Sequence, residues 1–150
     1  APPAKPSRKK GLGLTAKQGT GWLAKVQALQ PAWLYTWGGS RPEGLPAAVD
    51  FVPMVWGYWG QDAAIQKMGE AAKVSGQRHL LGFNEPDGKD QANIPVEKAL
   101  AARPALMKTG LRLGSPACVH PDNDWMKAFM KGVEERKLRV DFSTSSSEYL

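Results

Sequence analysis

The chain has 150 residues, of which 42% are hydrophobic, and a formal net charge of +6. This length and hydrophobic content predict one globular domain with a buried core and exclude a disordered tail. The sequence has no apolar run of the about 20 residues that a membrane helix needs, and it has no signal-peptide h-region. We therefore expect a soluble or already processed chain with no membrane partner.

The positive charge is concentrated at the N-terminus. One arginine and three lysines among the first ten residues supply four of the six net charges, and residues 1–7 also hold three prolines. This composition predicts a flexible Pro- and Lys-rich leader over residues 1–9. Because no aromatic residues are interleaved with these basic side chains, the charge does not indicate a nucleic-acid partner.

The first third of the chain predicts short strands and one helix. A strand is expected at residues 11–14, followed by a helix at 21–30 whose apolar residues have helical spacing. Further strands are expected at 32–37 and 51–56, and Pro53 should make the latter irregular, because proline has no N–H for a sheet ladder.

The rest of the chain continues this alternation. Helices are expected at 61–75, 96–109 and after residue 122, and strands at 79–83, 111–115 and 138–142. Pro104 should kink or interrupt the second of these helices, and Asp122 or Asp124 should cap the last one. Strands that alternate with helices are typical of an α/β fold, in which helices pack outside a parallel sheet.

The most informative motif is Leu81-Gly82-Phe83-Asn84-Glu85-Pro86, where a predicted strand ends in an amide and a carboxylate. Pro86 ends the strand, which leaves Glu85 at the mouth of the sheet. Partial burial there favours the protonated carboxyl group, which can then act as a proton donor near neutral pH. Asn84 offers one acceptor and two donors that can orient a sugar hydroxyl. The tetrapeptide alone is equally compatible with a turn that serves solubility.

Two tryptophans are expected beside Glu85. In parallel folds the ligand binds beyond the carboxyl ends of the strands, and Trp37 and Trp56 both fall at such ends. Flat indole rings stack on the apolar faces of sugar rings, so we predict sugar binding for both, with packing at the rim as the alternative. Trp22 and Trp125 lie on helical stripes and are predicted to pack in the core.

Seven motifs follow one another in the order Lys10-Gly11-Leu12-Gly13, Tyr35-Thr36-Trp37, Phe51-Val52-Pro53-Met54-Val55-Trp56-Gly57, Leu81-Gly82-Phe83-Asn84-Glu85-Pro86-Asp87, Leu113-Gly114-Ser115-Pro116-Ala117, Trp125 with Phe129, and Val140-Asp141-Phe142. In order and spacing they resemble the glycosyl hydrolase catalytic core of glycoside hydrolase family 128. Members of that family are endo-β-1,3-glucanases, and relatives of this type act in or on fungal cell walls. The resemblance covers residues 10–142, which we expect to be a partial catalytic domain followed by a divergent Ser-rich tail at 143–150.

The resemblance implies a (β/α)8 TIM barrel with retaining chemistry. Glu85 would correspond to the general acid/base at the end of the fourth strand, and Asn84 would contact the hydroxyl next to the anomeric carbon. Trp37 and Trp56 would line the glucan groove, and Asp87 receives no assigned role. The resemblance further implies a β-glucan partner, no cofactor, a monomer, and secretion or a cell-wall location.

The chain departs from the family pattern after Phe142, where the Ser-rich residues replace the strands that would carry a second glutamate as nucleophile. Retaining hydrolysis needs two carboxyl groups roughly 5 to 5.5 Å apart. Glu148 follows Phe142 too closely for a helix to intervene, so we do not expect it to serve. With about six strands present, we hypothesise an incomplete barrel with impaired activity or none. A non-catalytic β-glucan-binding protein is the alternative.

A metal site is a third possibility, because Cys118, His120, Asp122 and Asp124 alternate along one loop. These residues mix soft and hard ligands, and their spacing fits neither a zinc pattern nor a calcium loop. A surface turn that leads into a helix cap explains them better, so we predict no metal. The single cysteine also excludes an internal disulfide.

Overall fold

The structure is a computed structural model that describes residues 8–16 and 19–145. Most of the predicted leader, and the end of the predicted tail with Glu148, lie outside the described residues. The strands are β1 Gly11–Gly13, β2 Trp33–Tyr35, β3 Asp50–Phe51, β4 Met54–Val55, β5 His79–Gly82 and β6 Arg112–Leu113. The helices are α1 Gly21–Leu29, α2 Asp62–Val74, α3 Val96–Lys108 and α4 Asp124–Glu135.

All named strands pair in parallel, in two sheets of three strands with the orders β1-β2-β3 and β4-β5-β6. The chain passes from one sheet to the other at Val52 and Pro53, which separate β3 from β4. The Val52 N–H donates to Leu34 O at 2.9 Å, and the Leu81 N–H donates to Pro53 O at 2.9 Å. The irregularity expected at Pro53 is therefore the junction between a strand that pairs with β2 and one that pairs with β5.

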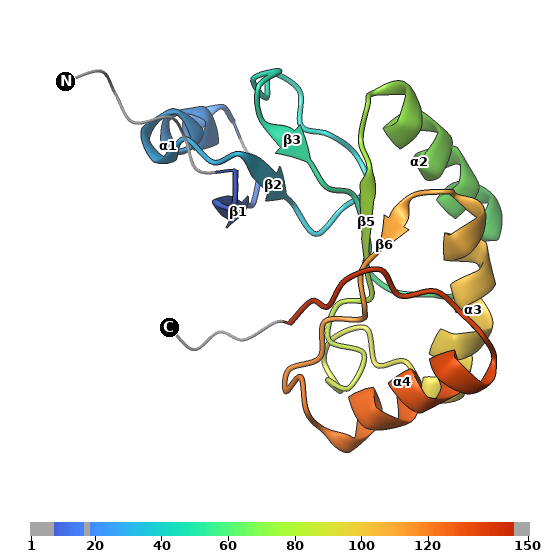
Figure 1. Ribbon diagram of the computed structural model, residues 1–150. Helices are drawn as coiled ribbons and strands as arrows, with labels where there is room; N and C mark the ends of the chain where they lie inside the picture. The colour runs from blue at the N-terminus through green and yellow to red at the C-terminus, as the bar shows by residue number, and fades with distance from the viewer. Residues whose placement is uncertain (1–7, 17–18, 146–150) are drawn as a thin grey trace.

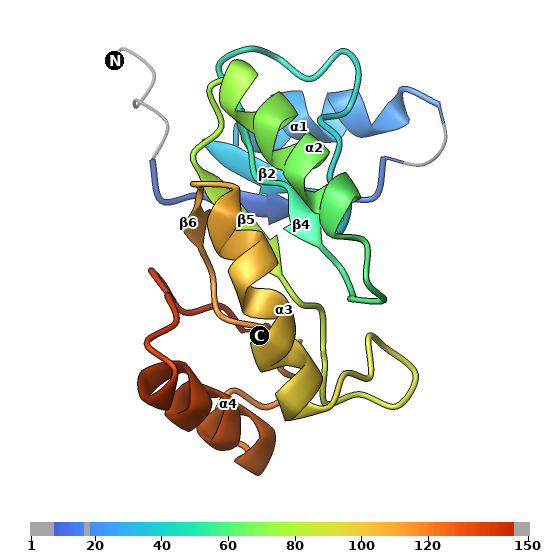
Figure 2. The ribbon, with the colours of Figure 1, turned by 90° about the vertical axis from the view of Figure 1, so that its right-hand side faces the viewer.

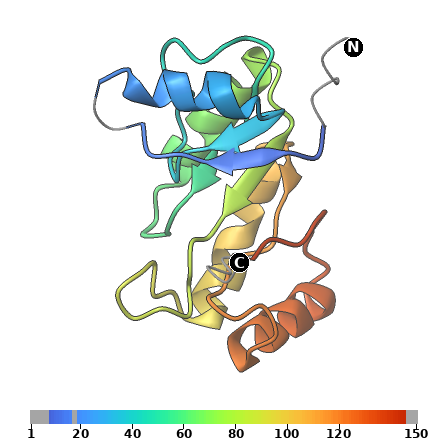
Figure 3. The same ribbon diagram turned by 90° about the vertical axis from the view of Figure 1, so that its left-hand side faces the viewer.

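The helices cover one side of the strands. In Figure 1, α2 and α3 run along the side of β5 and β6 that faces away from β1 and β2. Figure 2 shows the same helices in front of the strands, and Figure 3, from the opposite side, shows β5 with α3 behind it. This alternation confirms the α/β class. The described residues form two small parallel sheets, without closure into a barrel.

Two hydrophobic clusters hold these layers together. One lies under α1 and contains Trp22, which is 8% exposed. The larger one lies under α2, α3 and α4. Trp125 packs against the larger cluster, with its ring stacked on Phe129 at 5.4 Å and its indole N–H donated to Ile94 O at 2.8 Å. Both tryptophans on helical stripes therefore pack in the core, as the spacing predicted. No helix within the described residues is long and apolar enough to cross a membrane.

The strand predicted at 138–142 is wrong in extent, because only Phe142 pairs, in an isolated parallel bridge to Gly114. In residues 138–142 and their neighbours, side chains make hydrogen bonds that backbone groups would make in a regular strand pair. The Leu113 N–H donates to the Asp141 carboxylate at 2.7 Å, and Arg139 O accepts from Nε of Arg103 at 3.0 Å. These bonds satisfy groups that a regular ladder would have paired.

Two helix predictions also need correction. The predicted interruption at Pro104 is wrong, because α3 is continuous and its core-side neighbours Arg103 and Leu106 are buried, so that packing outweighs the lost N–H; the kink stays a prediction. Helix α4 is capped by Asn123, whose side-chain oxygen accepts the Met126 N–H at 2.9 Å, and not by either of the neighbouring aspartates.

Arg103 fastens α3 to the edge of the second sheet. Its side chain is fully buried and donates to Gly114 O at 2.7 Å as well as to Arg139 O. Its guanidinium lies 6.0 Å from the centroid of the Phe129 ring. Burial, which disfavours the charged form, lowers the pKa of Arg103 to about 10.

Gly69, in α2, is a point of close approach to Thr109. A Cβ at Gly69 would lie 2.7 Å from the Thr109 Cβ. We expect Gly69→Ala to lower the free energy of unfolding by about 1 to 3 kcal/mol, because this clash outweighs the gain in helix propensity. Gly21→Ala, in α1, meets no atom within 4 Å and should be neutral or stabilising. Chemical denaturation of both variants tests this, and equal stability gains would contradict it.

Candidate active site

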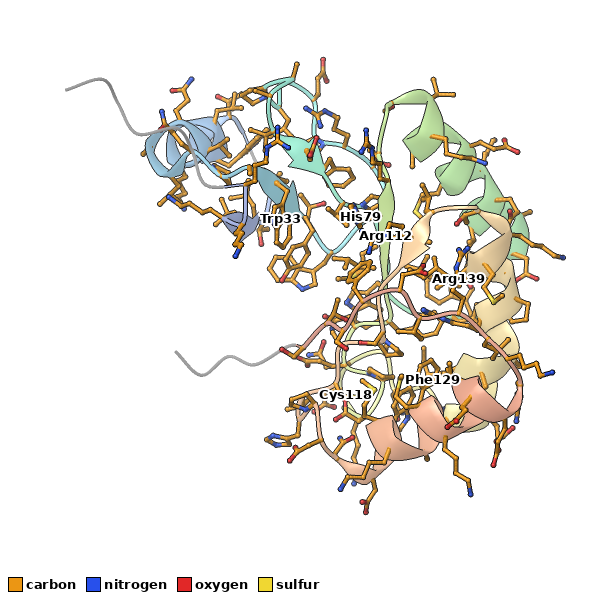
Figure 4. All side chains as sticks on the ribbon, viewed as in Figure 1. Trp33, His79, Arg112, Cys118, Phe129 and Arg139 are labelled. Atoms are coloured by element: carbon orange, nitrogen blue, oxygen red, sulfur yellow. The ribbon has the colours of Figure 1, made fainter. Side chains whose placement is uncertain are left out.

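A groove of about 890 Å³ runs along the side of the strands that the helices leave open. Side chains alternate along a strand, and every second residue of three neighbouring segments lines this groove. These residues are Trp33, Tyr35 and Trp37 after α1, Asp50, Val52, Met54 and Trp56 around the junction, and His79, Leu81, Phe83 and Glu85 around β5. Figure 4 shows Trp33 of β2 on the same open side as His79 of β5 and Arg112 of β6.

Glu85 follows β5 and lies in the groove, partly exposed. Its backbone is held on both sides, since its N–H donates to Ala117 O at 2.8 Å and its carbonyl accepts the Gly88 N–H at 3.0 Å. Its φ of 42° lies in the left-handed region, which costs a residue with a side chain on the order of 1 to 3 kcal/mol. The surrounding bonds therefore impose a backbone conformation that Glu85 would not adopt by itself.

Asn84 is 6% exposed and lies between two loops. Its N–H donates to Trp56 O at 2.9 Å, and it forms a parallel bridge with Ala117. Its side-chain Nδ2 donates to the Gln91 Oε1 at 3.0 Å. Gln91 also lines the groove, but nothing in the sequence pattern indicated it, because the loop that carries it returns to Asn84 only in the folded chain.

Trp37 and Trp56 stand at the same end of the groove as Glu85, since each follows the carboxyl end of a strand. Their residues are 38% and 37% exposed, unlike the core tryptophan Trp22. Trp37 has a φ of 59°, and its ring packs edge-on against Tyr35 at a centroid distance of 4.8 Å. The structure thus brings all four sequence-predicted site residues to one groove, while their roles stay predictions.

Of the described residues that line the groove, Glu85 and Asp50 carry carboxylates. They lie at opposite ends of the strands, because Asp50 begins β3 whereas Glu85 follows β5. Met54 pairs with Leu81. Asp50 lies four residues before Met54, and Glu85 lies four residues after Leu81. The two carboxylates are therefore separated along the strand direction by a distance on the order of 20 Å. Asp50 is therefore too distant to act with Glu85 on one glycosidic bond.

The loop that suggested a metal site is built differently. Cys118 is fully buried, and burial, followed by the negative charge of Asp87, raises the pKa of its thiol to about 12. Asn123, in the same loop, caps α4. Within the described residues no group of three His, Cys, Asp or Glu side chains is placed to hold a metal ion.

His79 lies in the groove at the strand end away from Glu85. Its Nε2 is 3.2 Å from Nη1 of Arg112, and its ring meets that of Phe142 edge-on at 5.6 Å. Desolvation, followed by the charge of Arg112, lowers the pKa of His79, and Arg78 adds to this while Asp50 opposes it. The folded protein therefore favours neutral His79.

Comparison with known proteins gives matches over most of the described residues. Residues 11–145 match the family model described as glycosyl hydrolase catalytic core. The chain is also 32% identical over 114 residues to alkali-sensitive linkage protein 1 of Schizosaccharomyces pombe. This match covers 71% of this chain and 20% of that protein.

Two solved structures illustrate the structural similarity. An endo-β-1,3-glucanase of glycoside hydrolase family 128, subgroup I, from Amycolatopsis mediterranei in complex with laminaritriose is 38% identical, with a TM-score of 0.74 over 91% of this chain and 56% of that one. A curdlan-specific exo-β-1,3-glucanase of subgroup III from Blastomyces gilchristii in complex with glucose is 32% identical, with a TM-score of 0.77 over 94% of this chain and 62% of that one. The chain thus spans little more than half the length of these relatives.

The lowered pKa of His79 predicts a pH-dependent stability. The unfolded chain binds a proton at His79 at higher pH than the folded chain does, so the free energy of unfolding falls as the pH drops from 7.5 to 5. His79→Gln should reduce this fall, and His120→Gln, at an exposed position, is the control for the substitution itself. Urea denaturation at several pH values measures both slopes, and identical slopes in wild type and His79→Gln would contradict the prediction.

Proposed function

Because the chain belongs to the glycosyl hydrolase catalytic-core family, we propose that it forms the acid/base part of a site for β-1,3-glucan hydrolysis. The observation that carries this proposal is the convergence of a strand-end glutamate, a buried asparagine and two half-exposed indoles on one groove. One relative, the Amycolatopsis mediterranei enzyme, has been crystallised with laminaritriose and, as mutants, with laminaripentaose and laminarihexaose, which supports β-1,3-glucan as the ligand.

In this proposal a glucan chain lies in the groove with sugar rings against Trp37 and Trp56. The apolar faces of the sugars lose water on the indoles, and their hydroxyl groups stay at the polar edges of the groove. Glu85 then protonates the oxygen of the leaving sugar, and later takes a proton from the attacking water in a retaining, endo-acting reaction.

Asn84 orients the sugar beside Glu85. Gln91 occupies one of its two side-chain N–H groups and fixes the plane of the amide. We assign the second N–H and the amide oxygen to the hydroxyl next to the anomeric carbon. That contact strengthens as positive charge develops on the sugar ring in the transition state.

A retaining reaction also needs a nucleophile, and Asp50 is too distant to supply it. We therefore propose that hydrolysis depends on a carboxylate outside the described residues, in a closed (β/α)8 barrel to which this chain contributes the strands around Glu85. The same observation favours a second candidate function, in which the chain binds β-glucan without cleaving it. A monomer that is secreted or located at the cell wall fits either role, since such polymers lie outside the cell.

Sugar stacking predicts which tryptophans affect binding. Trp37→Ala and Trp56→Ala should each weaken the binding of laminarihexaose about tenfold or more, because each removes a large apolar face from the groove. Trp59→Ala is the matched control, since Trp59 is 70% exposed but does not line the groove. Isothermal titration calorimetry gives the three affinities, and an effect of Trp59 as large as that of Trp37 would oppose the proposal.

Since no second carboxylate lines the groove near Glu85 within the described residues, we predict binding without turnover. We expect the 150-residue chain to bind laminarin but to release no reducing sugar above background, and Glu85→Gln to leave the affinity nearly unchanged because size and hydrogen-bonding reach are preserved. Reducing-end and calorimetric assays test both points. Glucanase activity that Glu85→Gln abolishes would show that a second carboxylate within these 150 residues reaches the site.

A further inference from the structure

Asp87 binds the loop that leads into α4. Its Oδ1 accepts the Val119 N–H at 3.1 Å, and its Oδ2 accepts from Nδ2 of Asn123 at 2.6 Å. Cys118, labelled in Figure 4, precedes Val119 in this loop, and its thiol is buried. One carboxylate thus receives hydrogen bonds from two residues of a loop that lies more than thirty positions further along the chain.

The beginning of the same loop holds the backbone of Glu85. The Ala117 N–H donates to Phe83 O at 2.8 Å, and Ala117 O accepts the Glu85 N–H at 2.8 Å. Asp87 and Glu85 are separated by Pro86 alone, whose ring fixes its φ. The segment 85–87 and the loop 117–119 therefore form a closed ring, with a backbone hydrogen bond at one end and the Asp87 carboxylate at the other.

We propose that Asp87 is a positioning residue that holds Glu85 in its left-handed conformation at the groove. This inference rests on the proposed role of Glu85 as acid/base. If the carboxylate released the loop, Ala117 would be held only through its own bonds to Phe83 and Glu85. The strained φ of 42° at Glu85 would then relax toward ordinary values, and its carboxyl group would change direction.

The chemistry of the ring requires a carboxylate at position 87. Val119 and Asn123 both act as donors to Asp87, and an ionised carboxylate accepts without presenting a proton of its own. Asn123 links this ring to α4, because its Nδ2 donates to Asp87 while its Oδ1 accepts the Met126 N–H. The negative charge therefore lies near the N-terminus of α4, where the helix dipole stabilises it.

The first test is Asp87→Asn in the 150-residue chain, with amide hydrogen exchange followed by NMR. The new amide presents an N–H to a donor, so the exchange of the Glu85 N–H should accelerate about tenfold, while core amides such as those of Leu80 and Phe129 keep their protection. Asp122→Asn removes an equal charge from an exposed position of the same loop and should leave Glu85 unchanged. Unchanged exchange at Glu85 in Asp87→Asn overturns the proposal.

Asn123→Asp keeps the cap of α4 but places a second carboxylate against Asp87, which provides a test if Asp87→Asn does not fold. At neutral pH the two charges repel, and the Glu85 N–H should exchange faster than in wild type. Below about pH 4 a shared proton restores the bond, and the protection relative to wild type should return. The proposal is overturned if the protection of the Glu85 N–H in Asn123→Asp, relative to wild type, is the same at both pH values.

Laminaritriose titration separates this inference from the proposed function. If wild type binds the sugar and Asp87→Asn binds it more weakly with faster exchange at Glu85, both stand. If wild type does not bind, the proposed function fails, while the exchange data still decide whether Asp87 holds Glu85. If binding persists and exchange at Glu85 does not change, the positioning role alone is refuted.

Discussion

Backbone pairing that continues past the ends of β5 and β6 is the constraint on which the site depends. The Ala117 N–H and carbonyl bond Phe83 and Glu85, although both segments have already left the regular strands. This pairing sets the place where Glu85 leaves the sheet and imposes its positive φ. Because Asn84 also donates its N–H to Trp56 O, the carboxyl ends of three neighbouring segments are joined at one point.

Because side chains alternate along these segments, they form two sets that lie on opposite faces of the strands. One set, with Leu34, Phe51 and Leu80, packs under the helices and forms the two clusters of the core. The other set, with Trp33, Leu81 and Glu85, lines the groove. A slip of one residue in register would exchange the two sets, so burial of the helix-facing side fixes which residues face the groove.

The match to glycosyl hydrolase catalytic cores and the geometry of the groove both support the proposed sugar-binding groove around Glu85. The described residues supply a candidate proton donor, a candidate hydroxyl-orienting amide and candidate stacking surfaces, and among them Glu85 is the one carboxylate that lines the groove at the strand end where these converge. Retaining hydrolysis takes place between two carboxyl groups, so in the proposed function sugar binding and turnover are separable. The role proposed for Asp87 makes the backbone of Glu85 depend on a loop that lies far along the chain.

The sequence by itself determined the α/β alternation, all four helices and the core positions of Trp22 and Trp125, because these follow from local periodicity. It also placed Glu85, Asn84, Trp37 and Trp56 at strand ends, from the same periodicity and from proline at fixed positions. Only the tertiary structure decided which loops meet there. Gln91 reaches Asn84, and Asp87 and Asn123 bind each other, through contacts between segments that have no common pattern. The strand expected at 138–142 was wrong for the same reason, since the side chains of Arg103 and Asp141 take ladder bonds that local sequence cannot assign.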